Sequence, residues 1–324
     1  MSRNKGNQSR EAIFSLYAKN LKLYLKSRNL QMAAQSEDGK FHFADYDIYL
    51  CPLCLSAFNI KAIAGANPLL TLEHCPPKSM GGKPLVLTCK KCNNSFGSKS
   101  DYHLLNTINK EPFLNMEMNS SMEMNFRFGE MPIKGEMELI GDKKILIKLN
   151  KKSNPHHIPK IEEILKKPEG EFKFQFTTSK KDAMKKGVMK SAYLYMFSLF
   201  GYAFVLDRNI VKLRESLLSE IDIVPYNVIG DNLPAEEIGL SIINEPTILN
   251  NYLLVLPVKT KTAKKNIGVI FPTGKEEGWQ NYLNWAMLTK NITTENTYFE
   301  NYKGIKADEY SFNDFYLLCE NSND

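Results

Sequence analysis

The spacing of apolar residues changes along the chain. In residues 9–33 they recur at roughly helical intervals, with Lys and Arg on other positions, which predicts an amphipathic helix. Residues 35–40 (QSEDGK) have the composition of a turn. Residues 41–50 alternate in polarity and predict a strand entering the first cysteine pair.

Beyond residue 120 the apolar residues recur every second position. This alternation predicts antiparallel strands at residues 122–128, 131–140, 143–149 and 171–177, with a hairpin turn at Gly141-Asp142. Residues 179–202 predict a long helix with Ser179 as its N-cap, and their aromatic side chains have the spacing of a packed core. A helix near 209–222, strands at 252–258 and 267–272 and a short helix at 276–290 complete the expected elements.

These elements define an α+β protein. Its 324 residues suggest two domains, and 43% hydrophobic with 24% charged residues is typical of folded domains. We expect a helical extension at 1–45, a compact cysteine-containing domain at 46–112 and an α+β domain at 113–324. No run of 18 apolar residues is present, and the N-terminus lacks the apolar segment of a secretory signal, so neither a membrane span nor secretion is expected.

Positive charge is concentrated in the N-terminal third. Residues 1–110 contain 15 Lys and Arg against 7 Asp and Glu, whereas the whole chain has a net charge of +6. Such an excess favours a polyanionic partner, although solubility alone accounts for it equally well.

Four of the six cysteines form two C-x-x-C pairs, Cys51/Cys54 and Cys89/Cys92, separated by 34 residues. In a chain without a signal, this pattern predicts a tetrahedral zinc site in a reducing compartment, so we expect a cytoplasmic protein. The alternatives are four unrelated cysteines or a thiol redox site, but the sequence has no thioredoxin-like βαβ pattern. A zinc ion held by four thiolates is coordinatively closed and therefore structural.

The residues between the two pairs predict a strand ending in Glu73-His74, a loop containing Gly81-Gly82, a second strand and then a helix starting near Asn93. A neutral imidazole can take a proton from water, and carboxylate and amide oxygens suit Mg²⁺. Five lysines surround this group and are candidates for binding phosphates: Lys78, Lys83, Lys90, Lys91 and Lys99.

The combined pattern of C-x-x-C, Glu73-His74-x-x-Pro77, Gly-Gly, C-x-x-C-Asn93 and Gly97 resembles the HNH endonucleases of the zinc-containing ββα-metal, treble-clef type. The resemblance covers about 55 residues and implies that His74 activates the attacking water. It implies that Glu73 and Asn93 hold a catalytic Mg²⁺ or Mn²⁺, and that the four cysteines hold a structural Zn²⁺. It also places the nuclease domain at 46–112.

The sequence departs from the family pattern in two places. The residue expected to position the catalytic histidine falls at Pro84, which has no side-chain amide, and the last histidine of the motif is missing near Gly97. Asp101 and His103 follow on the same predicted helix, and we interpret both as surface residues.

The expected function is metal-dependent hydrolysis of DNA phosphodiester bonds, with restriction or phage defence as the context that the resemblance implies. A homodimer or a partner protein of a defence system is an expected associate, because one active site cuts one strand. The alternatives are a zinc-stabilised nucleic-acid-binding module without catalysis, supported by Pro84 and the missing histidine, and a nuclease effector directed at RNA.

Overall fold

The computed structural model describes residues 2–35, 41–43, 46–128, 130–141, 144–150, 155–166, 173–175, 181–219, 239–245, 251–272, 280 and 293–296. It is a mixed helical and sheet structure, in which every strand pair is antiparallel. Within these residues no helix is both long and apolar enough to cross a membrane.

The chain begins with helix α1 (Ser2–Ser27), which starts and ends earlier than the predicted helix at 9–33. The strand predicted at 41–50 is divided: β2 (Phe41–Phe43) pairs with β1 (Ala33–Gln35), and β3 (Tyr49–Leu50) pairs with β4 (Ala57–Phe58). A short 3₁₀ helix, η1 (Ile60–Ile63), leads to the next hairpin.

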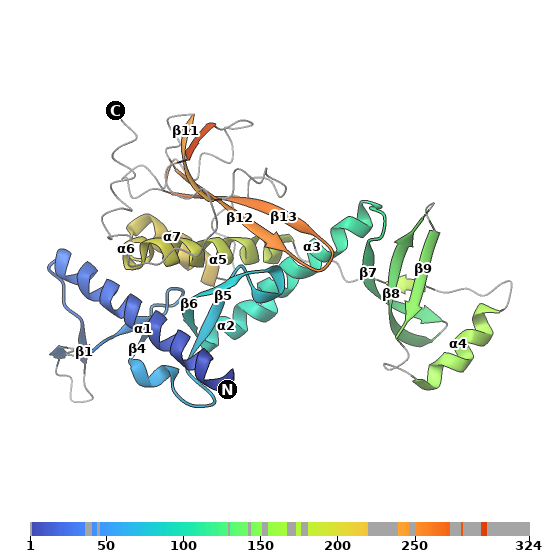
Figure 1. The fold of residues 1–324 in the computed structure, drawn as a ribbon, viewed down its shortest axis with the longest axis horizontal. Coiled ribbons are helices and arrows are strands. Elements are labelled where there is room, and N and C mark those ends of the chain that lie inside the picture. Colours follow the sequence, from blue (N-terminus) through green and yellow to red (C-terminus); the bar gives the residue numbers. More distant parts are fainter. Residues whose placement is uncertain are drawn as a thin grey trace.

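That hairpin consists of β5 (Leu70–Cys75) and β6 (Lys83–Cys89), joined by the short helix η2 (Lys78–Met80). Helix α2 (Lys90–Phe96) starts directly after β6 and continues through a π-helical turn, η3 (Gly97–Asp101), into α3 (Tyr102–Leu114). The order of strand, loop, strand and helix agrees with the sequence prediction. Figure 1 shows α2 and α3 running from this hairpin towards a separate sheet.

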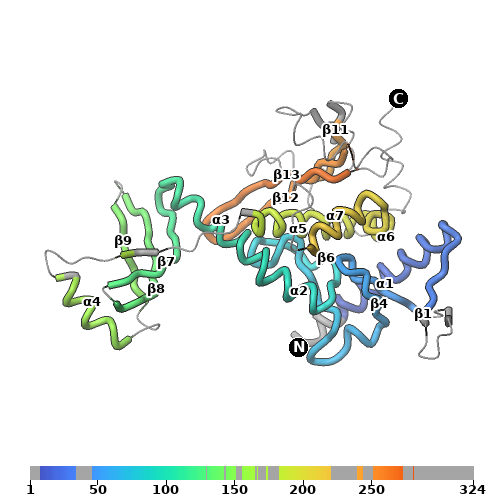
Figure 2. The backbone as a smooth tube through the Cα atoms, turned by 180° about the vertical axis from the view of Figure 1, so that it is seen from behind, coloured from blue at the N-terminus to red at the C-terminus, as the bar shows by residue number. Residues whose placement is uncertain are grey.

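The separate sheet has the strand order β10-β7-β8-β9. Its strands are β7 (Ser121–Phe128), β8 (Met131–Ile140), β9 (Lys144–Leu149) and β10 (Lys173–Gln175), close to the four predicted segments. The side chains of β7 alternate between buried and accessible, as its sequence pattern predicts. Helix α4 (Ile158–Leu165), preceded by η4 (Pro155–His157), covers this sheet, which lies at one end of the molecule (Figures 1 and 2).

The chain then returns to the first hairpin through α5 (Lys181–Phe200), α6 (Tyr202–Val205) and α7 (Arg208–Leu218). The second half of α5 is buried all round, because apolar residues occupy every side of the helix. Four strands follow in the order β13-β12-β11-β14: β11 (Gly239–Glu245), β12 (Tyr252–Lys259), β13 (Lys264–Phe271) and β14 (Thr293–Asn296). The predicted N-cap Ser179 and nearly all of the predicted helix at 276–290 lie outside the described residues.

Two hydrophobic cores are present among the described residues. The larger combines α1, the β5–β6 hairpin, α5 to α7 and β11 to β13. The smaller lies between the β7–β9 sheet, the end of α3 and α4. The expected domains 1–45, 46–112 and 113–324 therefore share the larger core, and the smaller one is formed by residues between 113 and 164.

Candidate functional site

The four paired cysteines converge at one end of the β5–β6 hairpin. Cys51 and Cys54 follow β3, whereas Cys89 ends β6 and caps α2. One ligand atom from each of the four lies within 4.8 Å of all the others, and the Cys54 and Cys89 sulfurs are 3.7 Å apart. In a tetrahedral zinc site with bonds of about 2.3 Å, the sulfurs are roughly 3.8 Å apart. The four cysteines could hold a zinc ion.

Backbone N–H groups donate hydrogen bonds to two of the sulfurs in this cluster. The backbone N–H of Cys89 donates to the Cys51 sulfur at 3.4 Å, and the N–H of Cys92 donates to the Cys89 sulfur at the same distance. Hydrogen bonding among the sulfurs lowers the pKa of the Cys54 and Cys89 thiols and raises the pKa of the Cys51 thiol, which is the donor. Donors directed at sulfur favour the thiolate, which is the form that binds metal.

Glu73 lies on the face of β5 that is covered by helices, and only 4% of it is exposed. Its Oε1 is 2.6 Å from the ammonium nitrogen of Lys190 on α5, and its Oε2 accepts a hydrogen bond from Thr88 at 3.1 Å. Both carboxylate oxygens are therefore engaged by the protein itself.

Lys190 also reaches Asp101 on η3, with Nζ 2.8 Å from Oδ2, and its side chain is only 1% exposed. Burial opposes the charged form of Lys190, but the two carboxylates outweigh it and raise its pKa. Burial also raises the pKa of Asp101, against the attraction of Lys190. The interpretation of Asp101 as a surface residue was wrong, because it joins Glu73 in a buried ion cluster.

Asn93 lies on α2 and donates from its side-chain amide to Thr71 Oγ1 at 2.9 Å. Thr71 precedes Glu73 by two positions on the same face of β5, a separation of about 7 Å along a strand. The hydrogen bond joins α2 to the hairpin. The carboxylate that shares a cation with Glu73 is Asp101, whereas Asn93 is held at Thr71.

His74 occupies the end of the hairpin away from the cysteines. In the strand register it pairs with Pro84, and a bulge on β6 lies between this pair and Glu73↔Val86. The side chain is half-buried; burial lowers its pKa, as does the nearby charge of Lys78, while Glu73 opposes them. No side chain or backbone group in the described part of the chain makes a hydrogen bond to its ring.

The loop between the two strands requires Gly82. A Cβ atom built on this residue would lie 1.4 Å from the carbonyl oxygen of Pro76, which is within bonding distance. Its neighbour Gly81 adopts φ +82°, a conformation that L side chains rarely adopt. The Gly-Gly sequence thus lets the two halves of the loop touch beside His74.

The five candidate phosphate-binding lysines all have exposed side chains. Lys78 and Lys83 lie on the loop and strand near His74, whereas Lys90 and Lys91 begin α2 beside the cysteines, and Lys90 donates to Asn67. Lys99 lies on η3.

Sequence reasoning missed Lys190. It lies in α5, where no sequence motif distinguishes it from Lys181, Lys185 and Lys186. The available signal was its position: Lys190 is the only charged residue between residues 187 and 206, a segment that is otherwise almost entirely apolar.

No family model, no curated protein and no solved structure matches this chain.

Proposed function

We propose that the chain is a zinc-stabilised endonuclease of the HNH type that hydrolyses nucleic-acid phosphodiester bonds. The observation that supports this most directly is His74, a half-buried histidine with a lowered pKa beside exposed lysines on a hairpin joined to a four-cysteine cluster. The strand–loop–strand–helix order around it supports the proposal, because the motif implies this order.

In the proposed reaction His74 is the general base. Because its pKa lies below the ordinary value of 6.5, the ring is neutral at pH 7 and can accept a proton from water. The water oxygen attacks phosphorus, the bond from phosphorus to the leaving oxygen breaks, and the leaving oxygen takes a proton from solvent water. Lys78 and Lys83 lie on the loop and strand next to His74, where they can hold the phosphate by charge.

The expected divalent-ion site does not fit the arrangement around Glu73. Its two oxygens are engaged by Lys190 and Thr88, and the Asn93 amide is bonded to Thr71. A divalent ion would stabilise negative charge on the phosphate, but at Glu73 it would first have to displace Lys190. The base step at His74 is therefore proposed without a metal ligand role for Glu73 or Asn93.

DNA is the proposed substrate, with restriction or phage defence as the proposed context, and a double-strand break would require a second copy or repeated nicking. Purified zinc-loaded protein should be incubated with supercoiled plasmid and with an RNA of equal length, with and without Mg²⁺ or Mn²⁺. The comparison is wild type against His74→Ala, with His156→Ala as the control, because His156 is exposed and far along the chain.

Nicking by wild type and by His156→Ala, lost in His74→Ala with zinc retained, is the expected result. Equal nicking by His74→Ala would refute the role of the histidine. Cleavage of the RNA alone would reassign the substrate.

A second candidate function is a zinc-stabilised nucleic-acid-binding module without catalysis. The ion pair between Lys190 and Glu73 favours this second function, because the buried ammonium occupies the position that a divalent ion would need. The nicking assay, run beside a DNA-binding measurement, separates the two candidates. A zinc-retaining protein that binds plasmid DNA but nicks it neither with nor without Mg²⁺ or Mn²⁺ supports the binding module, whereas nicking that depends on His74 supports the nuclease.

A further inference from the structure

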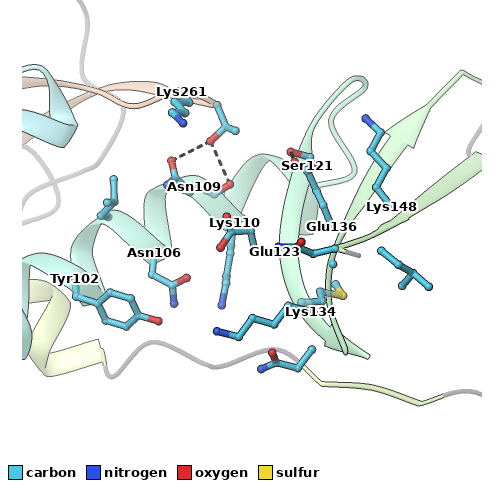
Figure 3. Close-up of a pocket in the computed structure, with 17 residues that line it drawn as sticks. Tyr102, Asn106, Asn109, Lys110, Ser121, Glu123, Lys134, Glu136, Lys148 and Lys261 are labelled. Atoms are coloured by element: carbon cyan, nitrogen blue, oxygen red, sulfur yellow. Dashed lines mark hydrogen bonds between the residues drawn. The ribbon is translucent and has the colours of Figure 1, made fainter. Parts of the chain in front are cut away.

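A large polar cleft lies away from the zinc cluster. Its volume is about 1000 Å³, at the upper end of the range for ligand pockets. Three parts of the chain form its walls: one side of α3, the β7–β9 sheet and the tip of the β12–β13 hairpin. Figure 3 shows these walls with their polar side chains directed into the space between them.

The wall from α3 presents Tyr102, Asn106 and Lys110 at intervals of four residues, so they share one face of the helix. Tyr102 is 52% exposed, and its ring makes a T-shaped contact with the ring of the neighbouring His103, with 5.5 Å between the centroids. Lys110 is largely covered, and burial lowers its pKa against the opposing effect of Glu123. In Figure 3 the Lys134 side chain of β8 extends from the sheet towards this helix face.

The hairpin tip is fixed to α3. Thr262 donates to the Asn109 side chain at 3.1 Å and contacts its backbone carbonyl at 3.3 Å (Figure 3). An ion pair between Lys265 and Glu111 makes a second connection. The cleft is therefore bounded by elements held at defined positions, and Lys261 at the tip lines it.

The chemistry of the lining distinguishes among ligands. Four lysines line the cleft, Lys110, Lys134, Lys148 and Lys261, of which Lys148 is in an ion pair with Glu138. Four asparagines and two glutamates lie among them: Asn106, Asn109, Asn125, Asn150, Glu123 and Glu136. Asparagine and glutamate can pair with the edges of bases, lysine holds phosphate, and an exposed tyrosine offers a stacking surface. Carboxylates repel phosphate, so the two glutamates argue against a groove that binds phosphate alone.

Unpaired bases are needed for this kind of recognition, because in a duplex the Watson–Crick edges are occupied and the base faces are stacked. The cleft is also connected to the zinc cluster by the continuous helical segment from α2 to α3. From Asn93 to Asn106 this segment spans roughly 20 Å, which one strand of nucleic acid could follow.

We propose that this cleft binds a short single-stranded segment of nucleic acid, with Tyr102 stacking on a base and Lys134 and Lys261 holding phosphates. The inference rests on the proposed function, since it assumes that the chain acts on nucleic acid. It adds a second contact region far from His74, which would select substrates that contain an unpaired strand.

The test measures binding separately from cleavage. Fluorescence anisotropy should follow labelled single strands of DNA and RNA about 12 nucleotides long, and a duplex of equal length, with the His74→Ala protein and no divalent ion. Tyr102→Ala and the double variant Lys134→Ala/Lys261→Ala are introduced into this background. The matched control is Lys144→Ala/Lys264→Ala, which removes the same charge from exposed positions on β9 and β13 that do not line the cleft.

Single strands should bind more tightly than the duplex. Tyr102→Ala should weaken single-strand binding about fivefold or more, the loss expected for one stacked base. The double lysine variant should weaken it about tenfold and reduce the slope of log affinity against log salt by about 1.4, whereas the control should match its parent.

Equal affinity of the double lysine variant and its control would overturn the inference, as would preference for the duplex or no binding at all. A mononucleotide that binds as tightly as the 12-nucleotide strand would also overturn it. Failure of plasmid nicking in the wild type leaves the binding comparison intact, so the two proposals can fail separately. A Lys90→Ala/Lys91→Ala variant, measured in parallel, shows how much of the binding comes from the start of α2 beside the four cysteines.

Discussion

Replacement of Lys190 by methionine tests the buried ion cluster. The substitution keeps a long unbranched side chain in α5 but removes the ammonium that contacts Glu73 at 2.6 Å and Asp101 at 2.8 Å. Lys190 and Glu73 are almost completely buried, and the Asp101 side chain is 14% exposed, so water cannot replace the lost contacts. Two carboxylates would then face each other without a counterion.

Removal of one partner of a buried ion pair typically costs about 3–5 kcal/mol, because the remaining charge stays desolvated. We expect Lys190→Met to lose stability in this range, which lowers the melting temperature of a chain of 324 residues by about 4–7 °C. In the variant both acids should hold protons more strongly in the folded state than in the unfolded state. Stability then falls as pH rises, so the deficit against wild type should be larger at pH 8 than at pH 5.

The assay is thermal and urea unfolding of the zinc-loaded protein at both pH values. Lys185→Met, on the same helix but outside the cluster, controls for the substitution itself. The double variant Glu73→Gln/Lys190→Met should regain part of the stability, because it removes one of the two uncompensated charges. A Lys190→Met protein as stable as Lys185→Met at pH 8 would refute the argument.

Three further predictions concern the zinc cluster, the histidine and the loop. Cys92→Ser should lose bound zinc and unfold at a lower temperature, whereas Cys75→Ala should keep one zinc per chain by metal analysis. The nicking rate of wild type should fall at acid pH with a midpoint below pH 6.5, because burial lowers the pKa of His74 from its ordinary value of 6.5; a midpoint above pH 6.5 contradicts this. Gly82→Ala should destabilise the protein by more than about 2 kcal/mol in urea unfolding, since its Cβ has no space beside the Pro76 carbonyl, and an unchanged urea midpoint would argue against this loop geometry.

The four-cysteine cluster and the nearby hairpin could be predicted from the sequence because their signals are local. C-x-x-C pairs, a Gly-Gly loop and alternating segments constrain the backbone within a few residues, and the structure brings the four cysteines together as expected. The strands β7 to β9 were predicted for the same reason, since burial of one sheet face imposes alternation. The strand predicted at 41–50 was divided by a segment that the pattern did not mark.

The ion pairing of Glu73 could not be predicted from such local signals. Its motif predicts a metal ligand, but its ionic partner lies 117 positions later in the chain. Asp101 had been placed on the surface because helical spacing alone does not show which neighbour covers a helix. Only the packing of α5 against the hairpin removes Glu73 and Asp101 from water and makes Lys190 necessary as their counterion.

The sequence by itself determined the cysteine cluster, the elements around it, the excess of basic residues near the N-terminus and the chemical character of His74 as a candidate base. Tertiary structure alone decided that residues after 180 return to complete the first core, that Lys190 neutralises Glu73 and Asp101, and that α3, the β7–β9 sheet and the β12–β13 hairpin enclose a cleft. The physical reason is the separation along the chain over which each effect acts. Metal-ligand spacing and strand alternation act over a few residues. Desolvation of charge and the shape of a cleft depend on contacts between segments far apart in the chain.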